Sequence, residues 1–430
     1  MSDEYLKIFH DKSIYVSANN EVEYIEGPQS EIAKHNHEKL KSILDNGWLD
    51  NIIRNSYLTS EENELIDDSF RKTIYRLIES ITSEVGRAIV GLIILQLTIK
   101  SIAPKQSIRL HKASNNRASF SWRDGIPMRV IDNTYITPKL REYNLLKLNA
   151  DGIMMTRSLA ENYPYTSLYK ANIRGAKSEW IEIVNAIEEI PEKALPALKL
   201  VISYLKNRTD QFLNRSNEAL EIVDKYLEHM SKKNELQAKL FSLPEISSYS
   251  ARLFEILIHS FYHTVSLNNG FDLFLKPLSQ MRSANKKHGN IGDIELLERP
   301  NTMLITEAWD AKFGKPYLRD ELEELKDKLE SHPETKIAGF ITNAEPVLNK
   351  EILERKKELE DIFGITIRIE SINSWLSNAL IEYNITDEMI FLKHWMRMFF
   401  EYLCLKQYNI APIDEPTYNW IEECLSALRQ

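Results

Sequence analysis

Two acidic residues and a lysine are the side chains of this sequence best suited to chemistry. Asp310 and Lys312 flank Ala311 in the segment 303–313, MLITEAWDAKF, which has the pattern of a strand. Residues i and i+2 of a strand lie on one face, so Asp310 and Lys312 are expected to project together. Asp293 opens the preceding predicted strand, which can bring its carboxylate beside Asp310. Two converging carboxylates suit Mg²⁺, a hard cation that prefers oxygen ligands and keeps several waters.

The pairing of Asp310 with Lys312 also indicates a reaction class. An acid and a lysine held side by side on a sheet face cost free energy if they are buried without a role. The arrangement becomes sensible if the acid holds a divalent metal and the lysine acts on a nearby water. Such a metal lowers the pKa of a water, stabilises charge developing on phosphate and orients both. The predicted chemistry is hydrolysis of a phosphate ester.

The elements that must position these residues are predicted in the second half of the chain. Helices are expected at 250–265, 318–331 and 349–363, and strands at 271–278, 292–297, 303–313, 336–342 and 365–369. This order, helix, three strands, helix, strand, helix, strand, predicts an α/β domain with a mixed sheet flanked by helices.

These residues and this order of elements resemble the PD-(D/E)XK nuclease superfamily, and within it type II restriction endonucleases. The resemblance covers residues 250–370. It implies a restriction-endonuclease-like core and Mg²⁺-dependent hydrolysis of double-stranded DNA. It also implies that Asp293, Asp310 and the main-chain carbonyl of Ala311 bind the metal. Lys312 would position or deprotonate the attacking water, and Glu255, in the preceding helix, occupies the place of an auxiliary acid.

The sequence departs from the family pattern at two positions and contains two further acids close to the predicted site. Gly292 stands where many members have proline, and Asp310 stands where many have glutamate. Glu295 would share the face of Asp293 and is an alternative acid. Glu307 would point away from Asp310 in a regular strand, but a bulge would reverse this, so Glu307 is the runner-up metal ligand. Ordinary surface charges on an α/β domain remain the alternative reading.

The N-terminal part is predicted to be a mostly helical DNA-recognition region, residues 1–245, with a basic aromatic insert at 101–180. The whole chain has a net charge of −9, whereas this insert is basic and could meet a phosphate backbone. The alternative is that its tyrosines are core residues. The candidate DNA-binding residues, including a loop at 282–288, are Arg117, Arg123, Arg129, Arg157, Lys170, Arg174, Arg282, Lys286 and Lys287.

Three further patterns are assigned to ordinary structure. The tripeptide His35-Asn36-His37 is expected on a solvated helix face, since the HNH nuclease motif is not contiguous. His259 and His263 have a spacing that can ligate metal, but without the rest of a zinc motif they are expected to pack or to face DNA. The charged run 320–324, with Lys326 and Lys328, is expected to be a solvated helix face.

Composition limits the remaining possibilities. Hydrophobic residues make up 43% of the 430 residues, which excludes a mainly disordered chain. Cys404 and Cys424 are too few for a disulfide framework or a cysteine zinc site. The longest apolar run, 88–99, is too short to span a bilayer and predicts a core helix. With a polar N-terminus, the chain is expected to be soluble and cytoplasmic, with no membrane partner.

The combined prediction is a catalytic core at 246–385, with a helical segment at 386–430 packed on it. Cleavage of a palindromic DNA site would call for a homodimer, and a cognate DNA methyltransferase would belong to the same restriction–modification system. Two alternatives stay open. One is another nuclease of the superfamily, acting in repair, in recombination or on modified DNA. The other is a catalytically idle DNA-binding protein.

Overall fold

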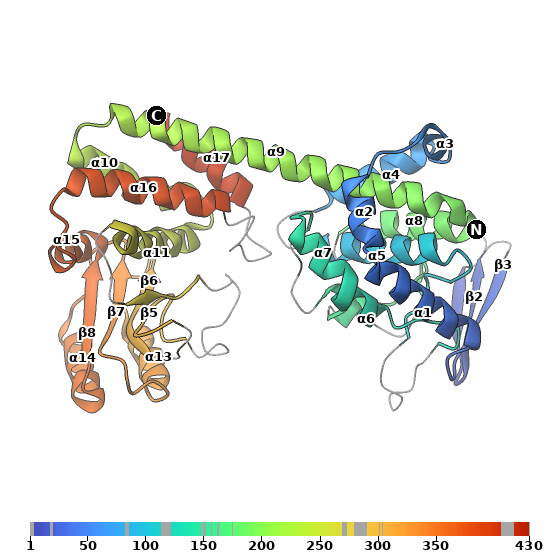
Figure 1. Ribbon diagram of the computed structural model, residues 1–430. Helices are drawn as coiled ribbons and strands as arrows, with labels where there is room; N and C mark the ends of the chain where they lie inside the picture. Colours follow the sequence, from blue (N-terminus) through green and yellow to red (C-terminus); the bar gives the residue numbers. More distant parts are fainter. Residues whose placement is uncertain are drawn as a thin grey trace. The chain divides into compact units, whose positions relative to one another are not determined.

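The chain divides into two compact units, Met1–Gln211 and Phe212–Gln430, and helix α9 (Ala194–His229) carries the boundary (Figure 1). A computed structural model describes residues 4–17, 20–81, 86–112, 122–146, 148, 152–155, 157–160, 163–173, 175–268, 273–278, 290–300, 302, 304–405 and 417–429. Residues 212–245, which the sequence pattern placed with the N-terminal region, therefore belong to the second unit.

The first unit begins with a small antiparallel sheet that the sequence pattern did not indicate. Its strands are β1 (Tyr5–Ile8), β2 (Lys12–Ser17) and β3 (Asn20–Ile25), in that order. Helices follow, as predicted for a mostly helical region, and some of them are short elements of the basic insert that the sequence pattern did not indicate. They are α1 (Glu31–Asp45), α2 (Trp48–Arg54), α3 (Ser60–Glu64), α4 (Asp68–Glu79), α5 (Arg87–Ile102), α6 (Met128–Ile131), η1 (Asp132–Ile136), α7 (Thr137–Glu142), η2 (Ile153–Met155), η3 (Arg157–Leu159), α8 (Lys177–Glu189) and η4 (Pro191–Lys193).

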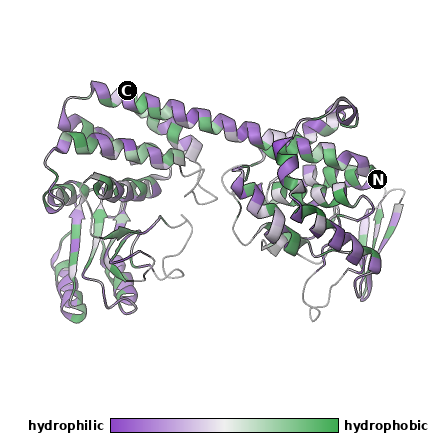
Figure 2. Ribbon diagram, in the orientation of Figure 1, coloured by the Kyte–Doolittle hydropathy of each residue, from purple (hydrophilic) through white to green (hydrophobic). Residues whose placement is uncertain are grey.

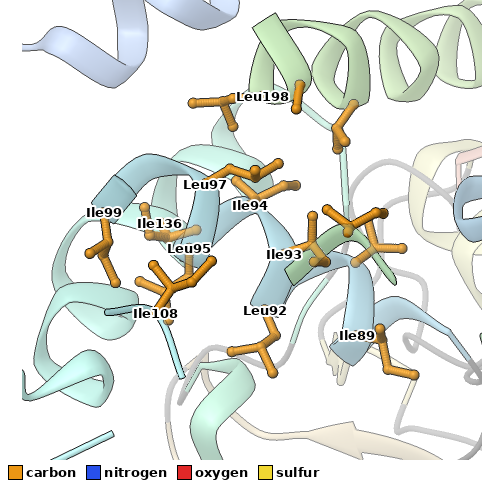
Figure 3. Close-up of a cluster of buried hydrophobic side chains, with 14 of the residues drawn as sticks. Ile89, Leu92, Ile93, Ile94, Leu95, Leu97, Ile99, Ile108, Ile136 and Leu198 are labelled. Carbon is orange, nitrogen blue, oxygen red and sulfur yellow. The ribbon is translucent and has the colours of Figure 1, made fainter. Parts of the chain in front are cut away.

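Helix α5 forms the centre of this unit, as predicted from its apolar run. It is apolar around its whole circumference and buried on all sides, the pattern of a core helix (Figure 2). Its leucines and isoleucines lie close to Ile108, Ile136 and Leu198 from other segments of the chain (Figure 3). None of the helices in the described part of the chain is long and apolar enough to cross a membrane.

Several aromatic residues of the basic insert belong to this core. Tyr165 and Tyr169 are buried, and the Tyr165 ring lies 5.3 Å from that of Trp180, centroid to centroid. Trp122 is also buried, against Tyr24 of β3. These rings are therefore not available to stack on nucleic-acid bases. For these three residues the alternative prediction, that they belong to the core, is confirmed.

His111 is a buried histidine of the first unit with a consequence for acid stability. Its Nδ1 has no hydrogen-bond partner among the described residues. Burial, and then the charge of Arg129, lower the pKa of His111 to about 4. The folded protein thus keeps this imidazole neutral, while the unfolded chain takes up a proton below about pH 6.5.

We expect His111→Gln to flatten the acid dependence of stability. In the wild type this one proton lowers the free energy of unfolding by about 1.4 kcal/mol per pH unit as the pH falls from about 6.5 to about 4. Urea unfolding at a series of pH values measures the slope, and the exposed His10→Gln is the matched control. Parallel curves for wild type and His111→Gln would contradict the prediction.

The second unit contains a five-stranded mixed sheet, as the sequence predicted. The strand order is β4-β5-β6-β7-β8, with β4, β5 and β6 antiparallel and β6, β7 and β8 parallel. The elements after α9 are α10 (Lys233–Ser242), η5 (Leu243–Ile246), α11 (Ser250–Asn268), β4 (Phe274–Leu275), β5 (Ile294–Leu297), β6 (Ile305–Lys312), α13 (Arg319–Leu329), β7 (Ile337–Thr342), α14 (Lys350–Phe363), β8 (Thr366–Ser371), α15 (Ile372–Glu382), α16 (Glu388–Leu405) and α17 (Thr417–Leu428).

Helices cover both faces of this sheet, and alternate residues of β6 contact the two layers (Figure 1). Trp309 and Ala311 pack in a cluster formed with α11, α15 and α16. Ala308 packs in a second cluster, formed with the leucines of α13 and with residues of α14. By the two-residue period of a strand, Asp310 and Lys312 share the face of Ala308. The charged pair of β6 therefore lies on the sheet face that α13 covers.

Candidate active site

The structure brings Asp310 and Lys312 together at the end of β6. The Nζ of Lys312 lies 3.3 Å from Oδ2 of Asp310. The Asp310 side chain is buried, with 5% of the residue exposed, and Lys312 is largely covered. A pair with so little contact with water interacts more strongly than a surface ion pair does.

Asp293 reaches the same place from the neighbouring segment. It immediately precedes β5, whose first residue, Ile294, pairs with Trp309 of β6. This antiparallel register sets Asp293 next to the end of β6, where its Oδ2 accepts a hydrogen bond of 3.1 Å from the Ala311 amide. The sheet topology thus places the two predicted metal-binding carboxylates side by side, although 16 residues separate them in sequence.

The charges in this group are strongly coupled. Burial, followed by the negative charges of Asp310 and Glu255, raises the pKa of Asp293 well above its ordinary value. Burial would lower the pKa of Lys312, but Asp310 and Asp293 outweigh it and raise that pKa. Glu255, on α11, also pairs with Arg252 one turn earlier. The buried carboxylates thus disfavour one another's charged forms, and a proton or a cation beside Asp293 would relieve this repulsion.

One oxygen of Asp310 is available to such a cation. Its Oδ1 is buried and has no hydrogen-bond partner among the described residues. The amide and carbonyl of a strand residue point to the same edge, so the Ala311 carbonyl leaves β6 on the side where its amide meets Asp293. Two carboxylates and a carbonyl are oxygen donors of the kind that Mg²⁺ prefers, so the residues present fit this ion.

This donor set is incomplete without water. No group of three or more His, Cys, Asp or Glu residues in the described ranges converges in a way that could hold a metal ion. A divalent ion bound by Asp293 and Asp310 would therefore take its remaining ligands from the main chain and from water. That is the usual condition of Mg²⁺, which sheds water reluctantly.

The other two acids named from the sequence lie elsewhere. Glu307 lies on the opposite face of β6, where its Oε1 accepts hydrogen bonds from Trp309 Nε1 at 2.5 Å and from Tyr262 of α11 at 3.3 Å. The register irregularity between β5 and β6 does not bring it to Asp310. Glu295 is bound through Oε2 to Lys276, at 2.6 Å, and through Oε1 to the Ile291 amide. Glu295 therefore anchors the segment that precedes Asp293.

Gly292 lies too close to the backbone of β6 to carry a side chain. A Cβ at this position would lie 2.6 Å from the carbonyl oxygen of Trp309 and 3.0 Å from its nitrogen. Both are backbone atoms of β6, which cannot move without disturbing the sheet. A residue without a side chain therefore lets the segment approach β6 closely enough for Asp293 to reach Ala311.

We expect Gly292→Ala to destabilise the protein by about 1–3 kcal/mol, because the added methyl group must push the segment away from β6. The same displacement moves the Asp293 carboxylate, so any activity of the site should fall with it. Urea unfolding measures the change in stability. A variant as stable as the wild type would show that the backbone accommodates the methyl group.

Lys328 is a site residue that the sequence analysis missed. It was expected on a solvated helix face, but its side chain is only 13% exposed. Its Nζ lies 3.6 Å from Oδ2 of Asp310 and donates a hydrogen bond of 2.9 Å to the Ile291 carbonyl. The sequence feature that could have indicated its burial is its position in α13, three residues after the buried Leu325 and next to the buried Leu329.

The two histidines of α11 have structural partners. His259 Nδ1 lies 3.1 Å and His263 Nδ1 2.8 Å from the hydroxyl oxygen of Tyr402, on α16. The Nε2 of His259 contacts the Lys276 carbonyl at 2.9 Å. The pair thus links α11 to α16 through one tyrosine, in agreement with the packing role expected for it.

The predicted DNA-binding residues can be followed only in part. Arg123, Arg129 and Lys170 are exposed. Arg129 donates a hydrogen bond of 2.9 Å to the Met154 carbonyl, and Lys170 lies 5.6 Å from the centre of the Tyr163 ring. The residues Arg117, Arg174, Arg282, Lys286 and Lys287, and the side chain of Arg157, lie outside what the structure describes.

No protein-family model matches this chain, and no curated protein is significantly similar to it. The assignment of a function therefore depends on the site itself, on Asp293, Asp310 and Lys312 at one end of a mixed sheet.

Proposed function

We propose that this chain is a Mg²⁺-dependent DNA nuclease with a restriction-endonuclease-like core of the PD-(D/E)XK type. The observation that carries the proposal is the Oδ1 of Asp310, a buried carboxylate oxygen without a partner in the described part of the chain. It lies on a residue whose other oxygen contacts Lys312, next to the Asp293 carboxylate. Most buried polar atoms in folded proteins have a hydrogen-bond partner, so an unpartnered carboxylate oxygen beside a second acid and a lysine favours a role in binding a cation.

The residues of the site have distinct tasks in this proposal. Asp293, Asp310 and the Ala311 carbonyl would hold the cation. When bound, Mg²⁺ would supply positive charge for the phosphate and a water of lowered pKa. The Asp310 carboxylate lies 3.3 Å from the Lys312 Nζ and holds this group in place, and a lysine side chain is ordinarily protonated at neutral pH. Lys312 would thus donate hydrogen bonds to the attacking water and the scissile phosphate, rather than remove a proton.

More narrowly, we propose a type II restriction endonuclease located in the cytoplasm. A palindromic recognition sequence would require one active site per strand, and hence a two-fold homodimer on DNA. A cognate DNA methyltransferase would protect the host sequence. Mass measurement by light scattering on cognate DNA tests the dimer, and a monomer alone would contradict it.

The direct test of the activity is incubation of the purified chain with plasmid DNA and Mg²⁺, followed by sequencing of the ends. A set of fixed fragments with one common end sequence is the expected result. Progressive shortening would indicate an exonuclease, and cleavage of methylated DNA alone a modification-dependent enzyme. DNA that is bound but stays intact would overturn the enzymatic proposal in favour of an idle DNA-binding protein.

A further inference from the structure

Lys328 connects the two segments that carry the acids of the site. Through one ammonium group it contacts Asp310 of β6 at 3.6 Å and the Ile291 carbonyl at 2.9 Å, two residues before Asp293. An ammonium has three donors and can serve both oxygens at once. The link therefore ties the residues before β5 to the end of β6.

The packing of helix α13 against the sheet fixes the position of Lys328. Leu325 and Leu329, beside it on the helix, are buried in the cluster under the sheet. Glu321, two turns earlier and so on the same flank of α13, is largely covered and binds Lys315 at 3.0 Å. Its charge also contributes to the raised pKa of Lys312. One flank of α13 therefore borders the site along two turns.

The contact with Lys328 also decides which Asp310 oxygen is available. Lys312 and Lys328 both lie nearest Oδ2, at 3.3 and 3.6 Å. The Oδ1 atom is left without a partner in the described residues, on the same carboxylate. Two cations on one oxygen fix the orientation of the group, because rotation would break both contacts.

We infer that Lys328 is a positioning residue of the active site. It orients the Asp310 carboxylate and anchors the 290–293 segment, so that the acids of Asp293 and Asp310 stay together despite their repulsion. This inference rests on the proposed function for its consequence in catalysis. The geometric part, the anchoring of the segment, holds whether or not DNA is the substrate.

The test compares Lys328→Met, which keeps the apolar stem, with Lys328→Arg, which keeps charge and donors. Lys326→Met is the matched control, because Lys326 lies on the same helix but pairs only with Glu330, at 3.7 Å, in the described structure. Three quantities are measured: amide exchange of residues 290–293 and 311 without metal, Mn²⁺ binding, and DNA cleavage with Mg²⁺.

In Lys328→Met we expect the Ile291 and Ala311 amides to exchange about 10-fold faster, because the segment opens more often. We expect Mn²⁺ to bind about 10-fold more weakly, the usual effect of losing a group that orients a metal ligand. Cleavage should fall with it. Lys328→Arg should restore most of each quantity, and Lys326→Met should match the wild type.

The outcomes separate this inference from the proposed function. Unchanged exchange and unchanged or tighter Mn²⁺ binding in Lys328→Met would overturn the role of Lys328, even if the wild type cleaves DNA. Failure of Lys328→Arg to restore either quantity would also overturn it. Altered exchange and Mn²⁺ binding in a protein that leaves DNA intact would support Lys328 and overturn the nuclease. A wild type without any Asp310-dependent Mn²⁺ site would overturn both.

Discussion

Asp310→Asn is expected to reduce Mg²⁺-dependent DNA cleavage by about 100-fold or more, because it removes the charge of the carboxylate whose Oδ1 is available to the cation. Lys312→Met should cause a loss of similar size, since the ammonium beside Asp310 is the donor proposed for the water and the phosphate. The two residues act as a unit, so the double variant should lose little more than either single variant. A plasmid-nicking assay at saturating Mg²⁺ measures all three.

The fold should survive these changes. Asparagine has nearly the shape of aspartate and relieves the repulsion with Asp293, but it also removes the negative charge that Lys312 and Lys328 share. We therefore expect Asp310→Asn to be less stable than the wild type in urea, but to remain folded and to keep its affinity for DNA. The matched controls are the exposed residues of α14, Asp361→Asn and Lys357→Ala. Full cleavage by Asp310→Asn and Lys312→Met would overturn the assignment of the site.

Glu188→Ala is expected to lower the free energy of unfolding by about 3–5 kcal/mol, because it leaves the buried Lys100 without its counter-ion. Glu188, on α8, accepts a bond of 2.6 Å from Lys100 Nζ on α5. Its other oxygen accepts bonds of 2.7 Å from the Ile108 amide and 2.8 Å from the Ser107 hydroxyl. One side chain thus satisfies three donors at the centre of the first unit.

Urea unfolding of Glu188→Ala against Glu189→Ala measures this effect, since Glu189 is the adjacent but exposed glutamate. The double variant Lys100→Met with Glu188→Ala should be more stable than Glu188→Ala alone, because it also removes the buried ammonium that has lost its counter-ion. A loss below about 1 kcal/mol in Glu188→Ala would mean that water and the Gln106 carbonyl, which already accepts a hydrogen bond of 3.1 Å from Lys100, satisfy the ammonium, and that the pair contributes as little as a surface ion pair.

Local patterns were sufficient for most elements of the second unit. The strand at 336–342 and the helix at 349–363 differ from β7 and α14 by a residue at most at each end. Asn349 caps α14 by accepting a hydrogen bond from the Ile352 amide, and Gly364 ends it in a left-handed conformation. Both signals are contained in a few adjacent residues. The β1–β3 sheet was missed, since its short strands are half exposed and mixed in polarity.

The proximity of Asp310 and Lys312 followed from residue types and spacing, because the two-residue period of a strand is a local property of the backbone. The role of Lys328 did not, because the rotation of α13 about its axis is set by the packing of Leu325 and Leu329 against a sheet formed by distant segments. The same holds for the available oxygen of Asp310 and for the burial of Tyr165. Whether a polar atom keeps a partner depends on every chain segment that folds around it, and no short stretch of sequence contains that information.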